Sequence, residues 1–383
     1  GGAGGGGGGD DVDPDALSYS LATSAWAHSP DVGSALKAEG MLLRMESWAV
    51  ARNRDLERAG ALPGHRIKLD VECYNTVLIA LSRCGDRDAP LRALTVLRRM
   101  IDLADSGSFR SVRPTAKSWN SVLNAFSRTR QRGIAQKAER VLEWMHESGC
   151  RPDVFSFAAV LHAYQNNAAP GTAQRADDIV RRMEELYRAG ELDVGPDVFH
   201  YTIVCACWAR SGEAIAARRC GQILGHMERL YLEEGNEGVR PNVRTYNAVI
   251  DAYARCKDVD TAEALLDRMI AAYKSDGDRS VKPDAFTFNA CINAWTRSRD
   301  RDAGERAEGV LAKLLEFHRD GNSDVRPDGR SFSHIIDYYS RHRPRRNAMT
   351  GGMIGGGGGG PTPILWATTP TRGGRGKGWG WGA

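Results

Sequence analysis

The sequence predicts an all-α fold, an α-solenoid of stacked helix-turn-helix repeats, and three observations support this prediction. A proline recurs six times in nearly the same setting, and the residue before it is Arg or Lys in five of the six. After each proline the apolar residues follow a helical period, and a second helical pattern with a buried methionine comes next. Such self-similarity indicates one array of short units, although 383 residues would ordinarily form two or three globular domains.

The first helix of each unit is marked by apolar residues at i, i+3, i+4 and i+7. Tyr246, Val249, Ile250 and Tyr253 show this pattern, which places one apolar stripe on one face of an amphipathic helix. We predict eight such helices, beginning at Ala16, Val71, Ala116, Val154, Val198, Val243, Ala285 and Gly329. Their opening aromatics are Tyr19, Tyr74, Trp119, Phe157, Tyr201, Tyr246, Phe288 and Phe332.

The second helix is marked by a small residue with an apolar residue seven positions later. Two helical turns separate the two, so they share a face, and we expect both to lie in the core rather than in a cofactor site. The proline then ends the unit, and the Asp, Asn or Thr after it can cap the next helix. The pairs are Ala38 and Met45, Ala93 and Met100, Ala138 and Met145, Ala176 and Met183, Cys220 and Met227, Ala262 and Met269, and Ala307 and Leu314.

Composition divides the chain into three parts. Of the 43 glycines, 22 lie in residues 1–9 and 351–383, so we expect residues 1–15 and 345–383 to be disordered and residues 16–344 to form the array, with seven complete units and a partial eighth. The net charge of +4 becomes −3 for residues 1–340 once the seven cations of 341–383 are removed. A protein that binds nucleic acid by bulk charge would be more basic, so any such binding must come from individually placed residues.

The eight cysteines include no CxxC pair, which predicts buried thiols in a reducing compartment. No apolar run approaches the ~20 residues that a membrane span requires. The chain begins with Gly rather than Met, so we expect a fragment in which a targeting peptide would not be visible.

The amino-acid sequence of the units resembles that of the pentatricopeptide repeat family, in its pure P-type form. The residues that carry the resemblance are Val-Arg-Thr-Tyr-Asn-Ala-Val-Ile-Asp-Ala-Tyr (243–253), Ala-Glu-Ala-Leu-Leu-Asp-Arg-Met (262–269) and Lys-Pro-Asp (282–284), and the pattern recurs over residues 16–340. The resemblance implies a right-handed superhelix that binds single-stranded RNA at about one base per repeat. These units, 38 to 55 residues apart, are longer than the family's, and we expect the extra residues to form loops at 101–112, 165–172 and 271–281.

In the family, the residue directly after the opening aromatic (here the reader residue) reads a base together with the residue just before the next first helix (here the cap residue). Asp and Asn differ at the cap because one only accepts hydrogen bonds and the other also donates. The alternative for each position is an ordinary helix cap or a solvated polar residue. The resemblance implies uracil for three pairs: Asn120 with Asp153, Asn247 with Asp284, and Asn289 with Asp328. It implies adenine for Thr202 with Asn242, guanine for Ser20 with Asp70, and a pyrimidine for Asn75 with Thr115. Ala158 with Asp197 has no polar reader, so the implied RNA site is 5′-G-Y-U-N-A-U-U-3′.

Two further rows have a role in the family. Nine residues after the aromatic, six units carry an arginine, which the resemblance places on the RNA backbone; the alternative is a cation at a helix C-terminus, worth about 0.3–1 kcal/mol. These are Arg83, Arg128, Arg210, Arg255, Arg297 and Arg341. The second residue of each unit would flank the bases, where Phe155, Phe199, Phe286 and Arg244 could stack and Glu72 would be a poor platform.

No motif predicts an enzyme or a cofactor. His226-Met227-Glu228 matches half of a zinc deaminase motif, but the chain lacks the CxxC pair that would complete it. The segment 372–381 resembles an RGG-type RNA contact, or is a product of an incorrect gene model. The expected partners are single-stranded RNA and other RNA-processing proteins, in a mitochondrion or chloroplast, with no membrane span and no small-molecule substrate. Two alternatives stay open: a protein-binding solenoid scaffold, or the RNA-targeting part of a truncated processing or editing factor.

Overall fold

A computed structural model describes residues 15–342, apart from residues 30, 32, 61–66, 168 and 170. Within these residues the chain forms fifteen α-helices and three short 3₁₀ helices, and it contains no strand. The glycine-rich ends, which the sequence predicts to be disordered, lie outside the described residues. Among the helices that are described, none is long and apolar enough to cross a membrane.

The helices alternate between a first and a second helix of each unit. The first helices are α1 (Ala16–His28), α3 (Val71–Arg83), α5 (Ala116–Arg128), α7 (Val154–Asn166), α9 (Val198–Ser211), α11 (Val243–Arg255), α13 (Ala285–Arg297) and α15 (Gly329–Arg341). The second helices are α2 (Ser34–Arg58), α4 (Ala89–Asp105), α6 (Ile134–Glu147), α8 (Thr172–Arg188), α10 (Ala216–Leu232), α12 (Val259–Asp276) and α14 (Ala303–Arg319). The 3₁₀ helices η2 (Arg110–Val112), η3 (Glu237–Val239) and η4 (Arg279–Val281) follow α4, α10 and α12.

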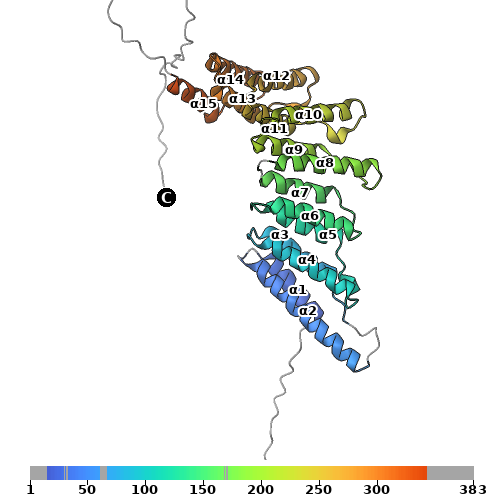
Figure 1. Ribbon diagram of the computed structural model, residues 1–383. Coiled ribbons are helices and arrows are strands. Elements are labelled where there is room, and N and C mark those ends of the chain that lie inside the picture. The colour runs from blue at the N-terminus through green and yellow to red at the C-terminus, as the bar shows by residue number, and fades with distance from the viewer. Residues whose placement is uncertain are drawn as a thin grey trace, which may run out of the picture. The chain divides into compact units, whose positions relative to one another are not determined.

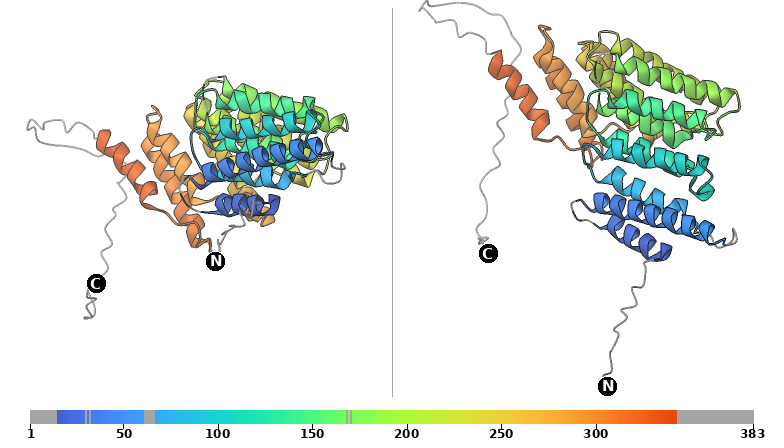
Figure 2. Two further views of the ribbon diagram at one scale, coloured as in Figure 1. Left: turned by 90° about the horizontal axis from the view of Figure 1, so that it is seen from below. Right: turned by 60° about the horizontal axis from the view of Figure 1, so that its bottom comes forward.

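Consecutive helix pairs stack in sequence order (Figure 1). Each first helix contacts the first helices of the neighbouring units, and each second helix packs on its own first helix and on that of the following unit. The first helices therefore form one layer and the second helices another, and Figure 2 shows the same succession from two other sides. This arrangement confirms the predicted all-α solenoid, in which each unit is stabilised by its neighbours.

All eight first helices begin at the residue that the sequence predicts. The reason is local, because the residue before each start caps the helix. Asp153, for example, accepts a hydrogen bond from the Ser156 N–H at 2.8 Å, and the Ser156 hydroxyl bonds back to the Asp153 N–H at 3.1 Å. The same reciprocal capping box, which satisfies two backbone donors, occurs at the starts of α5, α9, α11, α13 and α15, whereas Asp15 and Asp70 accept from one backbone N–H each at the starts of α1 and α3.

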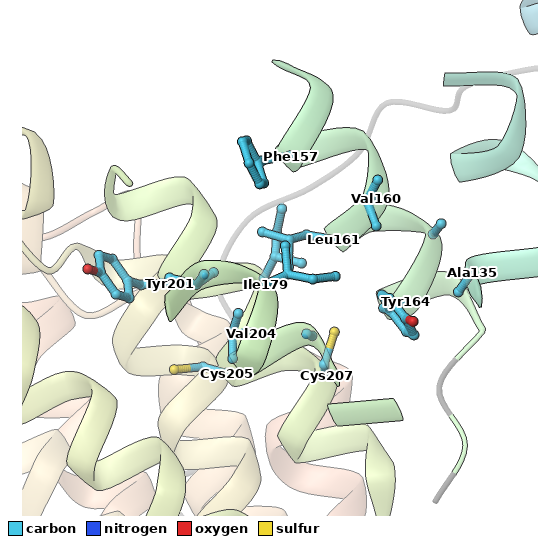
Figure 3. Close-up of a cluster of buried hydrophobic side chains, with 14 of the residues drawn as sticks. Ala135, Phe157, Val160, Leu161, Tyr164, Ile179, Tyr201, Val204, Cys205 and Cys207 are labelled. Atoms are coloured by element: carbon cyan, nitrogen blue, oxygen red, sulfur yellow. The ribbon is translucent and has the colours of Figure 1, made fainter. Parts of the chain in front are cut away.

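The core is continuous from unit to unit. Every member of the predicted pairs of a small residue and Met or Leu is at most 1% exposed. Figure 3 shows one section of this core, in which Phe157 and Tyr164 of α7 approach Ile179 of α8 and Val204 of α9. Five of the eight cysteines are buried and none of the eight forms a disulfide, in agreement with thiols used as small apolar side chains.

Two of the three loops that the sequence predicts, at 101–112 and 271–281, are largely helical, whereas the predicted loop at 165–172 contains the connection between the end of α7 at Asn166 and the start of α8 at Thr172. Residues 101–105 and 271–276 continue α4 and α12, which have 17 and 18 residues, whereas α6 of the shortest unit has 14. Residues 110–112 and 279–281 form the 3₁₀ helices η2 and η4. The apolar residues Ala104, Val112 and Val281 are buried, so the additional residues of the long units extend the hydrophobic core.

Buried hydrogen bonds also join successive helices, and the apolar pattern did not predict them. The Tyr201 hydroxyl of α9 donates to Glu184 of α8 at 2.7 Å, and His226 Nε2 of α10 lies 3.2 Å from the same oxygen. Tyr246, Glu228 and Arg268 repeat this arrangement one unit later. A tyrosine, a carboxylate and a histidine or arginine thus come from three successive helices, which fixes how the units pack.

We predict that Glu184 makes the array sensitive to acid. Burial alone would raise the pKa of this carboxyl group, but hydrogen bonds from His226 and Tyr201 outweigh it and hold the pKa below its usual value of 4.5. Because the folded pKa is depressed, the stability that Glu184 contributes is present above about pH 4.5 and is lost as the pH falls through the folded value. Glu184→Gln should cost about 1–3 kcal/mol of unfolding free energy at pH 7, from lost charged hydrogen bonds.

Urea unfolding between pH 3 and 7 tests this prediction. The difference between the wild type and Glu184→Gln should shrink as the pH falls. Glu143→Gln is the control, because Glu143 is exposed and lies 3.9 Å from Arg182, so this change should alter stability little at any pH. A difference for Glu184→Gln that stays constant down to pH 3 would contradict the role assigned to its ionisation.

Candidate nucleic-acid interface

Three of the predicted pairs of reader and cap residues are joined by hydrogen bonds across the boundary between units. The Asn120 amide donates to both carboxylate oxygens of Asp153, at 3.1 and 2.9 Å. The Asn247 amide lies 3.3 and 3.5 Å from the oxygens of Asp284. The Asn289 amide donates to Asp328 at 3.1 Å. The three pairs for which the resemblance implies uracil therefore share one geometry.

A third residue, which we call the bridging residue, completes each of these pairs. It lies three positions after the cap residue and its hydroxyl donates to the reader amide oxygen at 2.6–2.7 Å. With the nitrogen held by the carboxylate and the oxygen by the hydroxyl, the amide has one orientation. One N–H and one lone pair stay free for a ligand. The bridging residues of the three pairs, Ser156, Thr287 and Ser331, are fully buried.

Sequence reasoning missed the bridging residues. Ser or Thr occurs three positions after the cap residue in five units: Ser118, Ser156, Thr245, Thr287 and Ser331. That spacing could have been noticed, but on its own it indicates only a capping box within one helix. The bond back to the preceding unit becomes visible only when the units are stacked.

Two other pairs are linked through the bridging position without a direct bond. The Thr202 hydroxyl lies 2.8 Å from that of Thr245, and Thr245 caps its helix on Asn242. The Ser20 hydroxyl lies 3.1 Å from the Cys73 thiol, while Asp70 is exposed and accepts from the Glu72 N–H. The cap residues of these units hold helix starts, as the alternative interpretation expected, and Thr202 and Ser20 keep a partly exposed side chain.

The second unit departs from this arrangement. Asn75 is 0% exposed, its amide nitrogen donates to Glu72 at 3.2 Å, and the Ser118 hydroxyl donates to its oxygen at 2.7 Å. Thr115 lies 3.3 Å from the Ser118 hydroxyl, with no direct bond to Asn75. The structure therefore brings both residues to Ser118 but buries the Asn75 amide, whose nitrogen is held by Glu72 of its own helix.

In the fourth unit the reader is Ala158, and a histidine occupies the bridging position. The His200 ring is buried, with Nδ1 2.7 Å from Asp197 and Nε2 3.1 Å from the Val154 carbonyl oxygen. Burial would raise the pKa of Asp197, but the hydrogen bond and charge of His200 outweigh it and hold that pKa below its usual value. This unit thus presents no polar reader, as the sequence predicts.

All six arginines of the predicted backbone row are exposed at the ends of first helices. Within the described part of the chain, Arg83, Arg128 and Arg297 make no hydrogen bond or ion pair, whereas Arg210 donates to the Gln165 carbonyl at 3.3 Å and Arg255 pairs with Asp251 at 2.9 Å. Arg341 donates to the Asp337 carbonyl at 3.1 Å. A position near carbonyl groups at a helix end fits the capping alternative for Arg210 and Arg341.

An open groove of about 610 Å³ brings several predicted residues together across α3, α5 and α7. Arg83, Asn120, Asp153, Phe155 and Ala158 all line it. A second hollow of about 340 Å³ contains Arg255 and Arg297 between α11 and α13. The first groove therefore holds a cation, an oriented amide, a carboxylate and an aromatic ring in one place, which is the set that recognition of a nucleotide requires.

Comparison with known families agrees with the repeat pattern. The family described as PPR repeat matches residues 237–270, and the pentatricopeptide repeat domain family matches residues 108–167. The first match includes α11 with its reader Asn247, and the second spans α5 to α7 with the bonded pair Asn120 and Asp153. The chain contains pentatricopeptide repeats at these two places. No curated protein matches it in sequence.

Solved structures of a pentatricopeptide repeat protein resemble this one. The crystal structure of PPR10 in complex with an 18-nt psaJ RNA element has a TM-score of 0.38 and 17% identity, over 87% of this chain and 54% of that one. PPR10 from maize has a TM-score of 0.27 and 18% identity, over 86% and 52%. This pentatricopeptide repeat chain thus spans about half the length of the structures it matches.

The residues predicted to stack on bases are exposed in this pentatricopeptide repeat array. Phe155, Phe286 and Phe199 are 71%, 56% and 43% exposed, and Arg244 is exposed as well. The Phe199 ring meets His162 edge-on at 5.1 Å between centroids, and burial lowers the pKa of His162. Their exposure leaves these side chains accessible to a ligand.

Among the described residues of the repeat array, no group of three or more His, Cys, Asp or Glu side chains could hold a metal ion. His226, the start of the partial deaminase motif, lies on α10 and contacts Glu184 at 3.2 Å. The packing of α8, α9 and α10 accounts for the environment of His226.

Proposed function

We propose that this pentatricopeptide repeat array binds single-stranded RNA and selects bases through its reader and cap residues. The observation that carries the proposal is the set of three Asn–Asp pairs bonded across unit boundaries. Each holds an asparagine amide in one orientation with one donor and one acceptor free. Uracil offers a complementary acceptor and donor on its Watson–Crick edge, so such an amide supports a preference for uracil.

Two other groups support the binding of a strand. The exposed rings of Phe155, Phe199 and Phe286, and the flat guanidinium of Arg244, give each base a surface to stack on, worth about 1–3 kcal/mol per base. The row of arginines recurs in six of the eight units, at the spacing that a backbone following the units would need. The slot of Ala158 lies between Phe155 and Phe199 in sequence order, so we expect it to accept any base.

The proposed site is 5′-G-Y-U-N-A-U-U-3′ over residues 16–344. We propose a role without catalysis, in the stabilisation, processing or translation of organellar transcripts, in a mitochondrion or chloroplast. The Asn–Asp pairs at unit boundaries favour this function over a peptide-binding scaffold, because a peptide groove has no need of them. The exposed rings and the unpaired arginines support the same choice. Other RNA-processing proteins would act beside it.

Unbiased selection from a random RNA pool with the whole 383-residue chain tests the proposal. We expect an enriched motif with U at the third, sixth and seventh positions and A at the fifth. The variant Asn120→Ala, Asn247→Ala and Asn289→Ala, which removes the three bonded readers, should bind RNA without those preferences. Failure to enrich any motif would contradict base selection, and failure to retain RNA would contradict binding.

We predict that the three unpaired arginines contribute to binding without contributing to selectivity. Each phosphate contact to single-stranded nucleic acid adds about 0.7 to the slope of log affinity against log salt. The variant Arg83→Gln, Arg128→Gln and Arg297→Gln should therefore reduce that slope by about 2, and it should weaken binding to all sequences alike.

The charge-matched control for this prediction replaces exposed arginines of second helices. Arg44→Gln, Arg140→Gln and Arg218→Gln change the net charge equally but lie on α2, α6 and α10. We expect this control to keep the wild-type slope. Equal slopes for the two triple variants would show that the arginine row acts only through net charge.

A further inference from the structure

The second residue of each unit projects from the start of its first helix, and all eight of these residues are exposed: Leu17, Glu72, Lys117, Phe155, Phe199, Arg244, Phe286 and Arg330. Glu72 is the one acid in this row. Its carboxylate lies 2.7 Å from Nζ of Lys117, the equivalent residue of the following unit. An ion pair therefore crosses the second base slot, between two positions that would otherwise stack on a base.

The same carboxylate also holds the reader of that slot. One oxygen of Glu72 accepts from the Asn75 amide at 3.2 Å while the other binds Lys117. The hydrogen bonds from Lys117 and Asn75 lower the pKa of Glu72, so the carboxylate stays charged at neutral pH. Asn75 is fully buried, whereas Asn120, Asn247 and Asn289 stay partly exposed.

The cap residue explains why this happens in the second unit. In the three bonded pairs an Asp at the cap receives the reader's amide nitrogen. Thr115 has a hydroxyl in place of a carboxylate, and that hydroxyl lies beside Ser118. The Asn75 amide therefore finds its acceptor in Glu72, one turn earlier on its own helix.

We propose that Glu72 and Lys117 form a latch that closes the second base slot, so that the array does not select a base there. This inference rests on the proposed RNA binding, and it changes the expected site to 5′-G-N-U-N-A-U-U-3′. Both side chains of the latch are about half exposed, at 52% and 56%, so their ion pair is weak. Removing Glu72 should therefore open the slot without disturbing the fold.

The test compares RNAs that differ only in the base at the second position with RNAs that differ only at the sixth, opposite Asn247. For the wild type we expect the four bases to bind within about twofold at the second position, with a clear preference at the sixth. Glu72→Ala should create a preference for pyrimidines of about threefold to fivefold at the second position alone, since the weak ion pair is worth up to about fivefold. Lys117→Met should do the same to a smaller extent, because Glu72 still holds Asn75.

Asp178→Ala is the matched control. It removes an exposed i,i+3 ion pair with Arg181 on α8, whose side chains are 50% and 56% exposed. It should leave the base preference at both positions unchanged. Thermal melting of Glu72→Ala at the wild-type temperature would show that the variant is folded.

The outcomes separate the latch from the proposed function. A wild type that prefers a pyrimidine at the second position as strongly as uracil at the sixth would overturn the latch and leave RNA binding intact. A gain for Glu72→Ala that is equal for all four bases would also overturn it, because loss of repulsion between a carboxylate and a phosphate acts on every sequence alike. A chain that retains no RNA would overturn both proposals.

Discussion

Replacing Asn247 with Thr and Asp284 with Asn is expected to move the preferred base of the sixth slot from uracil to adenine. The combination already exists one unit earlier, where Thr202 and Asn242 lie beside the bridging residue Thr245. The swap removes the amide donor held by the Asp284 carboxylate and places a short hydroxyl in the slot. We expect a change of about tenfold or more in the ratio of the two affinities, as oriented hydrogen bonds to a base give about 1–3 kcal/mol.

Binding to a pair of RNAs that differ only at the sixth base measures this change. The fold should be unaffected, because Asn caps a helix as well as Asp does. Thr287→Val is a useful companion variant, since it removes the hydroxyl that donates to Asn247 at 2.7 Å and should weaken the uracil preference without creating one for adenine. Loss of binding to every RNA would point to misfolding, and an unchanged uracil preference would refute the reading of this slot.

The largest expected effect on stability is that of Trp119→Ala. Trp119 is 1% exposed and meets the Trp144 ring edge-on at 5.0 Å between centroids. Truncating a buried aromatic to Ala leaves a cavity and typically costs about 3–5 kcal/mol. Because each unit contacts only its neighbours, the loss should be concentrated in the third unit and should broaden the unfolding transition.

Urea unfolding followed by circular dichroism measures both effects. Trp144→Ala is the matched control, since Trp144 lies in the same unit and is only partly buried, so its loss should be smaller. A Trp119→Ala variant that is as stable as Trp144→Ala would contradict the assignment of the opening aromatic to the core. Both variants lose the contact between the two tryptophan rings, so the difference between their unfolding free energies reports on the burial of each side chain alone.

Local signals explain why so much of the fold could be predicted. Each first helix start depends on a cap residue and an apolar stripe, with a proline two residues before the start in every unit but the second, where Leu69 takes its place, and all eight starts were correct. The spacing between Ala176 and Met183, and its equivalents, likewise requires only the period of the helix. The lengths of α4 and α12 were not predicted, because no residue at 101 or 271 marks a helix end.

The candidate site was harder to predict because its geometry depends on contacts between units. The sequence identifies Asn120 and Asp153 as a pair through a family resemblance, yet it does not show that Ser156 holds both. The hidden amide of Asn75 follows from a threonine at residue 115 and a lysine at residue 117, which no local pattern would connect with it. Glu184 and Tyr201 illustrate the same limit in the core, since apolar periodicity carries no information about a buried carboxylate.

The bridging residues have a consequence for anyone who wishes to exchange parts of this array. A reader such as Asn247 is oriented by Thr287 and Asp284, which belong to the following helix pair. The smallest portable piece is therefore not the hairpin between two prolines but the span from the start of one first helix to the bridging residue of the next. Chimaeras joined at the proline would separate a reader from its supports, whereas junctions between a bridging residue and the next reader, such as between Thr287 and Asn289, would keep all three together.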